Sequence, residues 1–101
     1  MAAIDPNSEI RRAVDTGKVV FGEKQTEKSI LKGKPQLIII SSNLPKLKKE
    51  KILEIAKVAA VPYYEFKGTG LELGSICGKP FVVSVMAVLN SGKSNVLNLV
   101  K

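Results

Sequence analysis

The segment VVFGEKQTEKS, from Val19 to Ser29, combines a glycine with cationic, amide and hydroxyl side chains at the point where an apolar run becomes polar. This pattern indicates a strand that ends at Gly22 and a helix that begins directly after it. The first N–H groups of a helix have no acceptor within the helix and attract anions. Glycine also lets a ligand approach the backbone closely. The segment therefore predicts an anion-binding site, although an ordinary turn beside solvated lysines would give the same composition.

The charge of the chain favours a polyanionic partner. Its 101 residues include 16 lysines and arginines against 9 acids, a net charge of +7. A field of this sign attracts nucleic acid or an anionic membrane surface, and it also serves solubility. The apolar runs at 37–40 and 81–89 are shorter than the roughly 18 residues of a spanning helix, and residues 1–12 show no signal-peptide pattern. We expect a cytoplasmic protein with a single domain over 1–101.

Residue types that carry catalysis or bind metals are scarce. The sequence has no histidine and one cysteine, Cys77, with no base nearby to activate it. Cys77 is therefore expected to be a packed core thiol in a reducing compartment. Most acids stand beside lysines at the spacing of solvated ion pairs. We expect no catalytic residue, no metal site and no cofactor.

Two segments resemble nucleotide-binding motifs without completing them. NSGKS at 90–94 ends like a phosphate-binding loop, but Ala87 occupies the position where that motif needs its first glycine. GTGLELG at 68–74 is rich in glycine, yet a dinucleotide fingerprint would require glycine in place of Leu73. A small nucleotide-binding or regulatory enzyme is therefore the less favoured alternative to a binding module.

Caps, glycine and proline positions and hydrophobic periodicity predict alternating helices and strands. Helices are expected from Pro6, with Asp5 as N-cap, to Gly17, at 23–32, from Pro45 to Ala59, and from Thr69 to Gly78. Strands are expected at 18–21, 35–43, 61–66 and 81–89, and residues 94–100 form either a last short helix or a strand. The alternation predicts an α/β protein, a three-layer α/β/α sandwich with a central four-stranded mixed sheet.

Helix starts that follow parallel strands meet at one edge of the sheet, where such folds bind their ligands. Lysines there can bind phosphates, while amides and hydroxyls can read base edges or sugar hydroxyls. This edge is predicted to bind RNA, and it is expected to carry Gly22, Glu23, Lys24, Gln25, Thr26 and Lys28 after the first strand, and Asn43, Lys46 and Lys48 after the second.

Several separated segments carry a family resemblance. DTGKVVFGEKQTEKSILKGKPQLIIISSNLP, VPYYEFKGTGLELGSICGKPF and the strand that follows resemble the L-thirty-e family of archaeal and eukaryotic large-subunit ribosomal proteins, over roughly residues 8 to 95. That family belongs to the kink-turn-binding superfamily of α/β/α sandwich proteins. The resemblance implies a non-catalytic constituent of the large ribosomal subunit that binds rRNA at a kink-turn-like internal loop. A kink-turn protein of another RNA particle is the alternative within the superfamily.

The resemblance also implies partners and contacts. Neighbouring large-subunit ribosomal proteins are expected partners, and the free protein is expected to be a monomer. Phe81 matches an aromatic residue that begins the last long strand and stacks on an unpaired base, with Val83 as an apolar neighbour; composition alone would assign Phe81 to the core. The remaining implied RNA contacts are Gly22, Lys24, Gln25, Thr26, Lys28, Asn43 and Lys48.

Glu23 and Glu27 depart from a purely basic motif. A carboxylate facing a phosphate would repel it, so both acids are expected to support the helix start, to pair with lysines and to point away from the RNA. If Glu23 instead faced the RNA, part of the assigned contact surface would be wrong.

Overall fold

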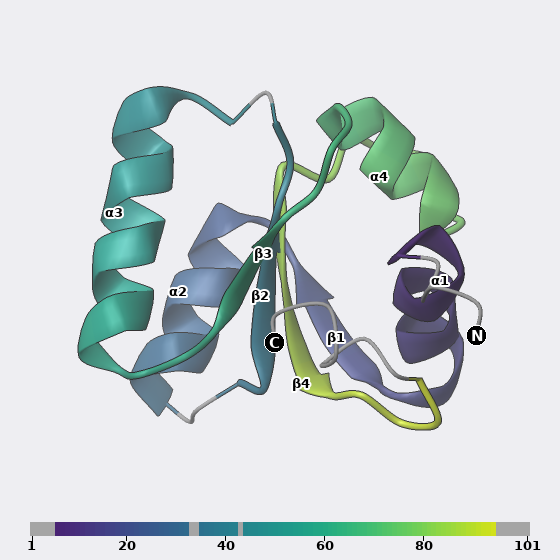
Figure 1. Cartoon of the computed structure of the whole chain (residues 1–101), viewed down its shortest axis with the longest axis horizontal. Helices are drawn as coiled ribbons and strands as arrows, with labels where there is room; N and C mark the ends of the chain where they lie inside the picture. The colour runs from purple at the N-terminus through teal and green to yellow at the C-terminus, as the bar shows by residue number, and fades with distance from the viewer. Residues whose placement is uncertain (1–5, 33–34, 43, 95–101) are drawn as a thin grey trace, which may run out of the picture.

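A computed structural model describes residues 6–32, 35–42 and 44–94. Its elements follow the predicted order (Figure 1): α1 (Pro6–Thr16), β1 (Lys18–Phe21), α2 (Glu23–Lys32), β2 (Leu37–Ile40), α3 (Lys46–Val58), β3 (Tyr63–Glu65), α4 (Gly70–Ile76) and β4 (Val85–Asn90). Three predicted features lie outside the described residues: the N-cap Asp5, the contact residue Asn43 and most of the segment 94–100. Within the described part of the chain, no helix has the length and apolar character needed to cross a membrane.

The four strands form one mixed sheet in the order β1-β4-β2-β3. β4 is antiparallel to both of its neighbours, while β2 and β3 are parallel, so β1, β2 and β3 share one direction. Their ends therefore meet at one edge of the sheet, which we call the carboxyl edge: residues 22–24, 41–42, 44–48, 66–69 and 79–84. The opposite end, called the amino edge, comprises residues 16–18, 35–37, 61–63 and 90–94.

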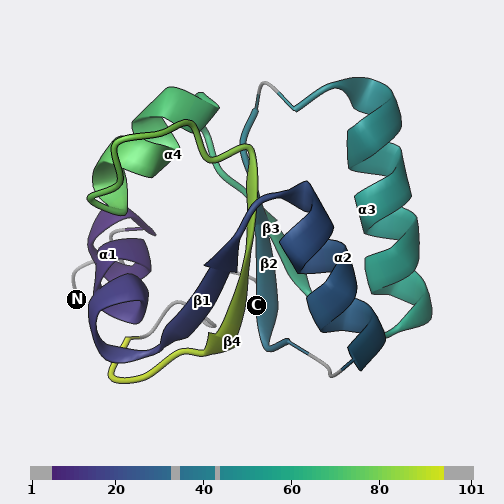
Figure 2. The same ribbon diagram turned by 180° about the vertical axis from the view of Figure 1, so that it is seen from behind.

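Helices cover both faces of the sheet. α1 and α4 pack on one face, and α2 and α3 pack on the other (Figures 1 and 2). β2 explains this arrangement, because its side chains alternate between the two faces of the sheet. Leu37 and Ile39 pack on the side of α1 and α4, while Ile38 and Ile40 pack on the side of α2 and α3. All four of these side chains are fully buried. The predicted three-layer sandwich, with a central strand buried on both faces, is confirmed.

The predicted strands are longer than the observed ones. Three are shortened: 35–43 to Leu37–Ile40, 61–66 to Tyr63–Glu65, and 81–89 to Val85–Asn90. The last difference matters most, because the Val83 N–H donates to the Gly70 carbonyl of α4 at 2.9 Å. Residues 81–84 therefore follow α4 across the carboxyl edge instead of extending β4, and Phe81 precedes that strand instead of beginning it.

Candidate nucleic-acid interface

Gly22 makes the turn from β1 into α2. Its φ is +98°, a left-handed conformation that other L-residues rarely adopt. Its N–H donates to the Val85 carbonyl at 2.9 Å, and its carbonyl accepts the Thr26 N–H at 3.0 Å. A Cβ added at Gly22 would meet no heavy atom within 4 Å. The turn therefore leaves open space beside a helix start whose first N–H groups have no helical acceptor.

The predicted contact residues of α2 lie partly on the surface and partly in the interior. Thr26 and Ile30 lie one turn apart and are buried against the sheet, which turns Lys24, Gln25 and Lys28 toward solvent. Thr26 has no exposed surface, and its Oγ1 has no hydrogen-bond partner among the residues that the structure describes. The Thr26 side chain therefore lies beneath the predicted contact surface, while the other three lie on it.

Both acids of α2 pair with lysines of α3. Glu23 Oε2 lies 3.5 Å from Lys48 Nζ, and Glu27 Oε1 lies 3.3 Å from Lys51 Nζ. The expectation that these carboxylates pair with lysines is confirmed, although their partners belong to the neighbouring helix. In contrast, the predicted contact lysines Lys24, Lys28 and Lys46 have no carboxylate within 4.0 Å among the described residues.

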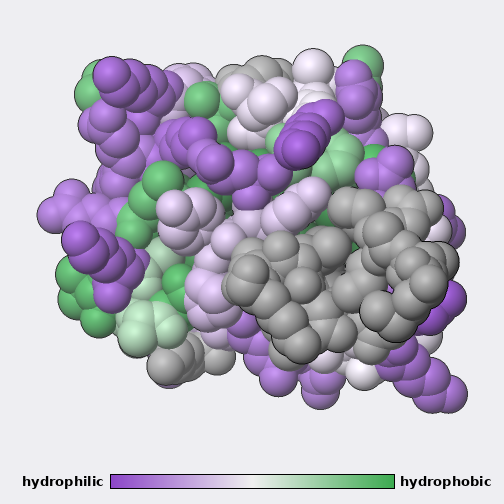
Figure 3. All heavy atoms as spheres, in the orientation of Figure 1, coloured by the Kyte–Doolittle hydropathy of each residue, from purple (hydrophilic) through white to green (hydrophobic). Residues whose placement is uncertain are grey.

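The start of α3 concentrates positive charge. Pro45 is its N-cap and provides no side-chain hydrogen bond, and no acid lies in the first turn. Lys46, Lys48 and Lys49 instead occupy the positive end of the helix dipole, an arrangement that costs stability unless anions compensate it. Lys49 forms an ion pair with Glu65 of β3. Hydrophilic residues accordingly gather over the start of α3, at the upper left of Figure 3.

Phe81 lies beside the Gly22 turn. Its side chain is 48% exposed, which contradicts a core assignment from composition alone. Its ring meets the ring of Phe21 edge to face at a centroid distance of 6.0 Å, and Phe21 directly precedes Gly22. Lys79 Nζ lies 5.4 Å from the centroid of the same Phe21 ring. The structure therefore brings an accessible aromatic ring and a further lysine to the carboxyl edge.

Val83 differs from its predicted role as an apolar neighbour at the contact surface. It is 1% exposed and belongs to the core between the sheet and α4. Val83 therefore supports the segment that carries Phe81 from below and offers almost no surface to a ligand.

The glycines of α4 position this segment, a role that the sequence analysis missed. A Cβ at Gly74 would collide with the Phe81 carbonyl, and one at Gly70 would lie 2.6 Å from Cγ1 of Val82. The Lys79 N–H donates to the Gly74 carbonyl at 2.9 Å. The signal was the spacing of these glycines, four residues apart and hence on one face of a helix.

In the NSGKS segment at the amino edge, the N–H groups of residues 91–94 are already used in hydrogen bonds within the chain. The Ser91 N–H donates to Gln36 Oε1 at 2.8 Å, and the Lys93 N–H donates to Thr16 Oγ1 at 3.0 Å. The Gly92 N–H donates to Asn90 Oδ1 at 2.8 Å, and the Ser94 N–H donates to the Ser91 carbonyl at 3.1 Å. The resemblance to a phosphate-binding loop is therefore limited to sequence.

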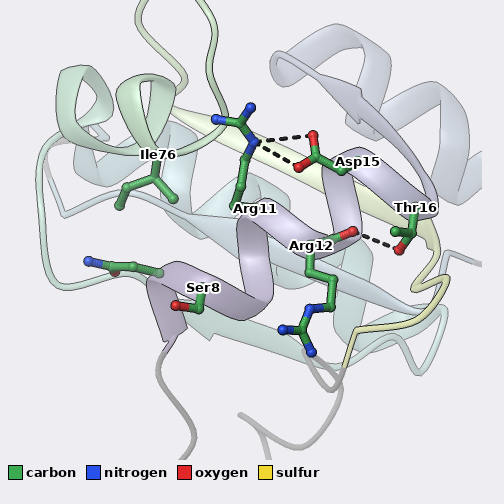
Figure 4. Close-up of a pocket in the computed structure, with 7 residues that line it drawn as sticks. Ser8, Arg11, Arg12, Asp15, Thr16 and Ile76 are labelled. Atoms are coloured by element: carbon green, nitrogen blue, oxygen red, sulfur yellow. Dashed lines mark hydrogen bonds and ion pairs between the residues drawn. The ribbon is translucent and has the colours of Figure 1, made fainter.

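The arginines that line a pocket over α1 are already paired with carboxylates. Figure 4 shows Arg11 turned toward Asp15, and its Nε lies 3.0 Å from Asp15 Oδ2. Arg12 Nη1 lies 3.9 Å from Glu9 Oε2. The two guanidinium groups that line the pocket are therefore balanced by carboxylates of the same helix.

Cys77 is the buried thiol that the sequence predicted. It is 3% exposed, and its Sγ donates to Met86 Sδ at 3.8 Å. Burial raises the pKa of Cys77 from 9.0 to about 11, and nearby Lys79 and Arg11 only partly oppose this shift. The thiol therefore stays protonated at neutral pH, which makes it a poor nucleophile.

Known proteins resemble this chain in sequence and in fold. The large ribosomal subunit protein eL30 of Methanocaldococcus jannaschii is 45% identical over 98 residues, covering 97% of this chain and 89% of the relative. Its counterpart from Methanothermobacter thermautotrophicus is 43% identical over 97 residues, covering 96% and 99%. A solved Bacillus halodurans protein of unknown function matches the fold with a TM-score of 0.81 and 25% identity, covering 95% of each chain. The model of the Ribosomal protein L7Ae/L30e/S12e/Gadd45 family matches residues 5–98, and the chain belongs to this family.

Proposed function

We propose that the protein is a non-catalytic constituent of the large ribosomal subunit that binds rRNA through its carboxyl edge, at a kink-turn-like internal loop. The ribosomal role rests on the family and on relatives named large ribosomal subunit protein eL30. The protein is accordingly proposed to reside on the ribosome in the cytoplasm. The free protein is proposed to be a monomer that meets neighbouring large-subunit proteins only on assembly.

The observation that carries the proposed RNA site is the open Gly22 turn between two helix starts that carry cations. Lys24 and Lys28 approach from α2, and Lys46 approaches from α3, none of them paired with a described carboxylate. A sharp bend in RNA crowds phosphates together, and such a cluster binds most strongly to several cations placed side by side. Gly22 has no side chain to keep the RNA backbone away from this cluster.

Phe81 is proposed to contact an RNA base, in addition to the contacts that the lysines make with phosphates. A sharply bent internal loop leaves bases unstacked, and an exposed aromatic ring can receive one of them. Stacking of this kind contributes about 1 to 3 kcal/mol per base. Gln25 and Asn43 are proposed to contact base edges or sugar hydroxyls, and Lys48 is proposed to exchange its ion pair with Glu23 for an RNA phosphate.

A titration with three ligands tests the proposal. The full chain is mixed with a kink-turn RNA, with a straight duplex of the same length and composition, and with ATP. Tight binding to the kinked RNA, weaker binding to the duplex and no saturable binding of ATP are expected. Tight ATP binding combined with indifference to the kink would contradict the proposal and favour a nucleotide-binding protein.

A further inference from the structure

The outer surface of the α2/α3 layer carries an ion pair that the proposed RNA site does not use. Glu27 Oε1 and Lys51 Nζ are 3.3 Å apart, and the lysine side chain is 62% exposed. Both helices start at the carboxyl edge and run away from it. At about 1.5 Å of rise per residue, Glu27 lies about 6 Å beyond Glu23, and Lys51 lies about 7.5 Å beyond Lys46.

Kinked and straight RNA would depend on this surface to different degrees. A kinked RNA is held by the open Gly22 turn and by the Phe81 ring as well as by lysines such as Lys28. A straight duplex makes no use of the open turn or of the stacking ring, so its affinity depends on how many lysines are free to meet phosphates. The helical surface beyond the edge presents Lys28 from α2 and Lys51 from α3. Of these two, only Lys51 has a carboxylate partner among the described residues.

We propose that Glu27 is a specificity-determining residue, which lowers the affinity for unkinked RNA by holding Lys51 away from phosphates. This inference rests on the proposed RNA-binding function. Because its lysine is exposed to solvent, the ion pair is weak and the effect is modest, but it acts on non-specific contacts along this surface. Kinked RNA is less affected, because the Gly22 turn and the Phe81 ring supply contacts that do not depend on the number of free lysines. Glu27, a carboxylate within a basic motif, thus increases the preference for kinked over straight RNA.

The test replaces Glu27 with its uncharged isostere. Glu27→Gln is expected to bind a straight RNA duplex about two- to fivefold more tightly at low salt and to change the affinity for the kinked RNA by a smaller factor. The slope of log K against log salt for the duplex should become steeper by about 0.7 to 0.9, the effect of one additional phosphate contact.

Two controls separate this mechanism from a general effect of charge. Glu50→Gln makes the same change in net charge on α3, at an exposed acid that forms no ion pair with a described residue. It should change duplex affinity less than Glu27→Gln. The double variant Glu27→Gln/Lys51→Gln should lose the gain, because the freed lysine is its source.

Each outcome decides a different claim. Equal gains for Glu27→Gln and Glu50→Gln, or a gain that persists without Lys51, would overturn the role of Glu27. So would unchanged duplex binding by Glu27→Gln. A wild-type protein that fails to prefer kinked RNA would instead contradict the proposed function, independently of any variant. Thermal unfolding of each variant confirms that the compared proteins are folded.

Discussion

Two glycine turns at opposite ends of one sheet show how similar residues produce different surfaces. FGEKQTEKS contains Gly22 at the carboxyl edge, and NSGKS contains Gly92 at the amino edge. Both glycines have positive φ, +98° and +60°. Around Gly22 the space for a Cβ is empty, whereas a Cβ at Gly92 would lie 2.5 Å from the backbone carbon of Thr16. The first glycine opens the surface to a ligand, and the second packs two chain segments together.

Their polar groups differ in the same way. The N–H groups of residues 91–94 all donate to acceptors within the chain. At the carboxyl edge, the helix starts keep donors without helical acceptors and carry lysines without described carboxylate partners. A glycine–lysine motif therefore indicates an anion site only where the surrounding fold leaves its donors unused.

The largest expected effect concerns the packed end. Gly17→Ala places a Cβ against the Asn90 carbonyl and 2.9 Å from the Gly92 nitrogen. Because backbone atoms cannot move aside cheaply, the free energy of unfolding should fall by about 3 kcal/mol, as measured by urea denaturation. The RNA affinity of the folded fraction should not change. A fully stable Gly17→Ala protein would show that the amino edge is not tightly packed.

The next effect concerns the two half-exposed aromatic side chains. Phe81→Ala should weaken binding of the kinked RNA by about 1 to 3 kcal/mol, since it removes a stacking contact, without changing the salt dependence. Tyr63→Ala is the matched control, because Tyr63 is 45% exposed and lies at the amino edge. Filter-binding titrations at several salt concentrations measure both quantities. An equal loss of RNA affinity from Tyr63→Ala would mean that RNA binding does not distinguish the carboxyl edge from the amino edge.

Gly22→Ala should affect both stability and binding. Its left-handed backbone conformation should cost about 1 to 2 kcal/mol of folding free energy once a Cβ is present. The methyl group would also project into the open space and weaken RNA binding by the folded protein. Unfolding and binding measurements on the same samples separate these effects. Unchanged RNA affinity would show that the RNA backbone does not come close to Gly22.

The smallest effect compares Lys28, on α2 beyond the carboxyl edge, with Lys93 at the amino edge. Lys28→Ala should weaken binding of kinked RNA and make the salt slope shallower by about 0.7 to 0.9, the contribution of one phosphate contact. Lys93→Ala removes an exposed lysine at the amino edge and should change the slope much less. Identical slopes for wild type and Lys28→Ala would mean that Lys28 meets no phosphate.

Local patterns predicted the elements well but not the depth of individual side chains. LIII at 37–40 was identifiable as a fully buried strand because its apolar run is uninterrupted and short. FVVSVMAVL was predicted as one strand because its nine residues are apolar except for Ser84. Its first part instead lies on α4, because Gly70 and Gly74 permit a close approach there. That contact joins residues distant in sequence, so no local pattern could reveal it.

The same limit applies to the site. The lysines and Gly22 were predicted from their place after a strand, since topology alone brings such residues to one edge. Thr26 and Val83 were predicted to lie on the contact surface, but both are buried. Thr26 lies on the face of α2 that packs on the sheet, and the path of residues 81–84 turns Val83 into the core. That Glu23 and Glu27 pair with α3 depends on how two helices pack side by side. The sequence shows the charges but not their partners.

Amide chemical shifts of the isotope-labelled full chain, recorded during titration with kinked RNA, would show which edge of the sheet binds the RNA. The largest changes are expected at Gly22 to Gln25, at Lys46 to Lys48 and at Lys79 to Val82, with little change at Ser91 to Ser94. Large changes at residues 91–94 and small ones around Gly22 would contradict it, because RNA would then bind the amino edge.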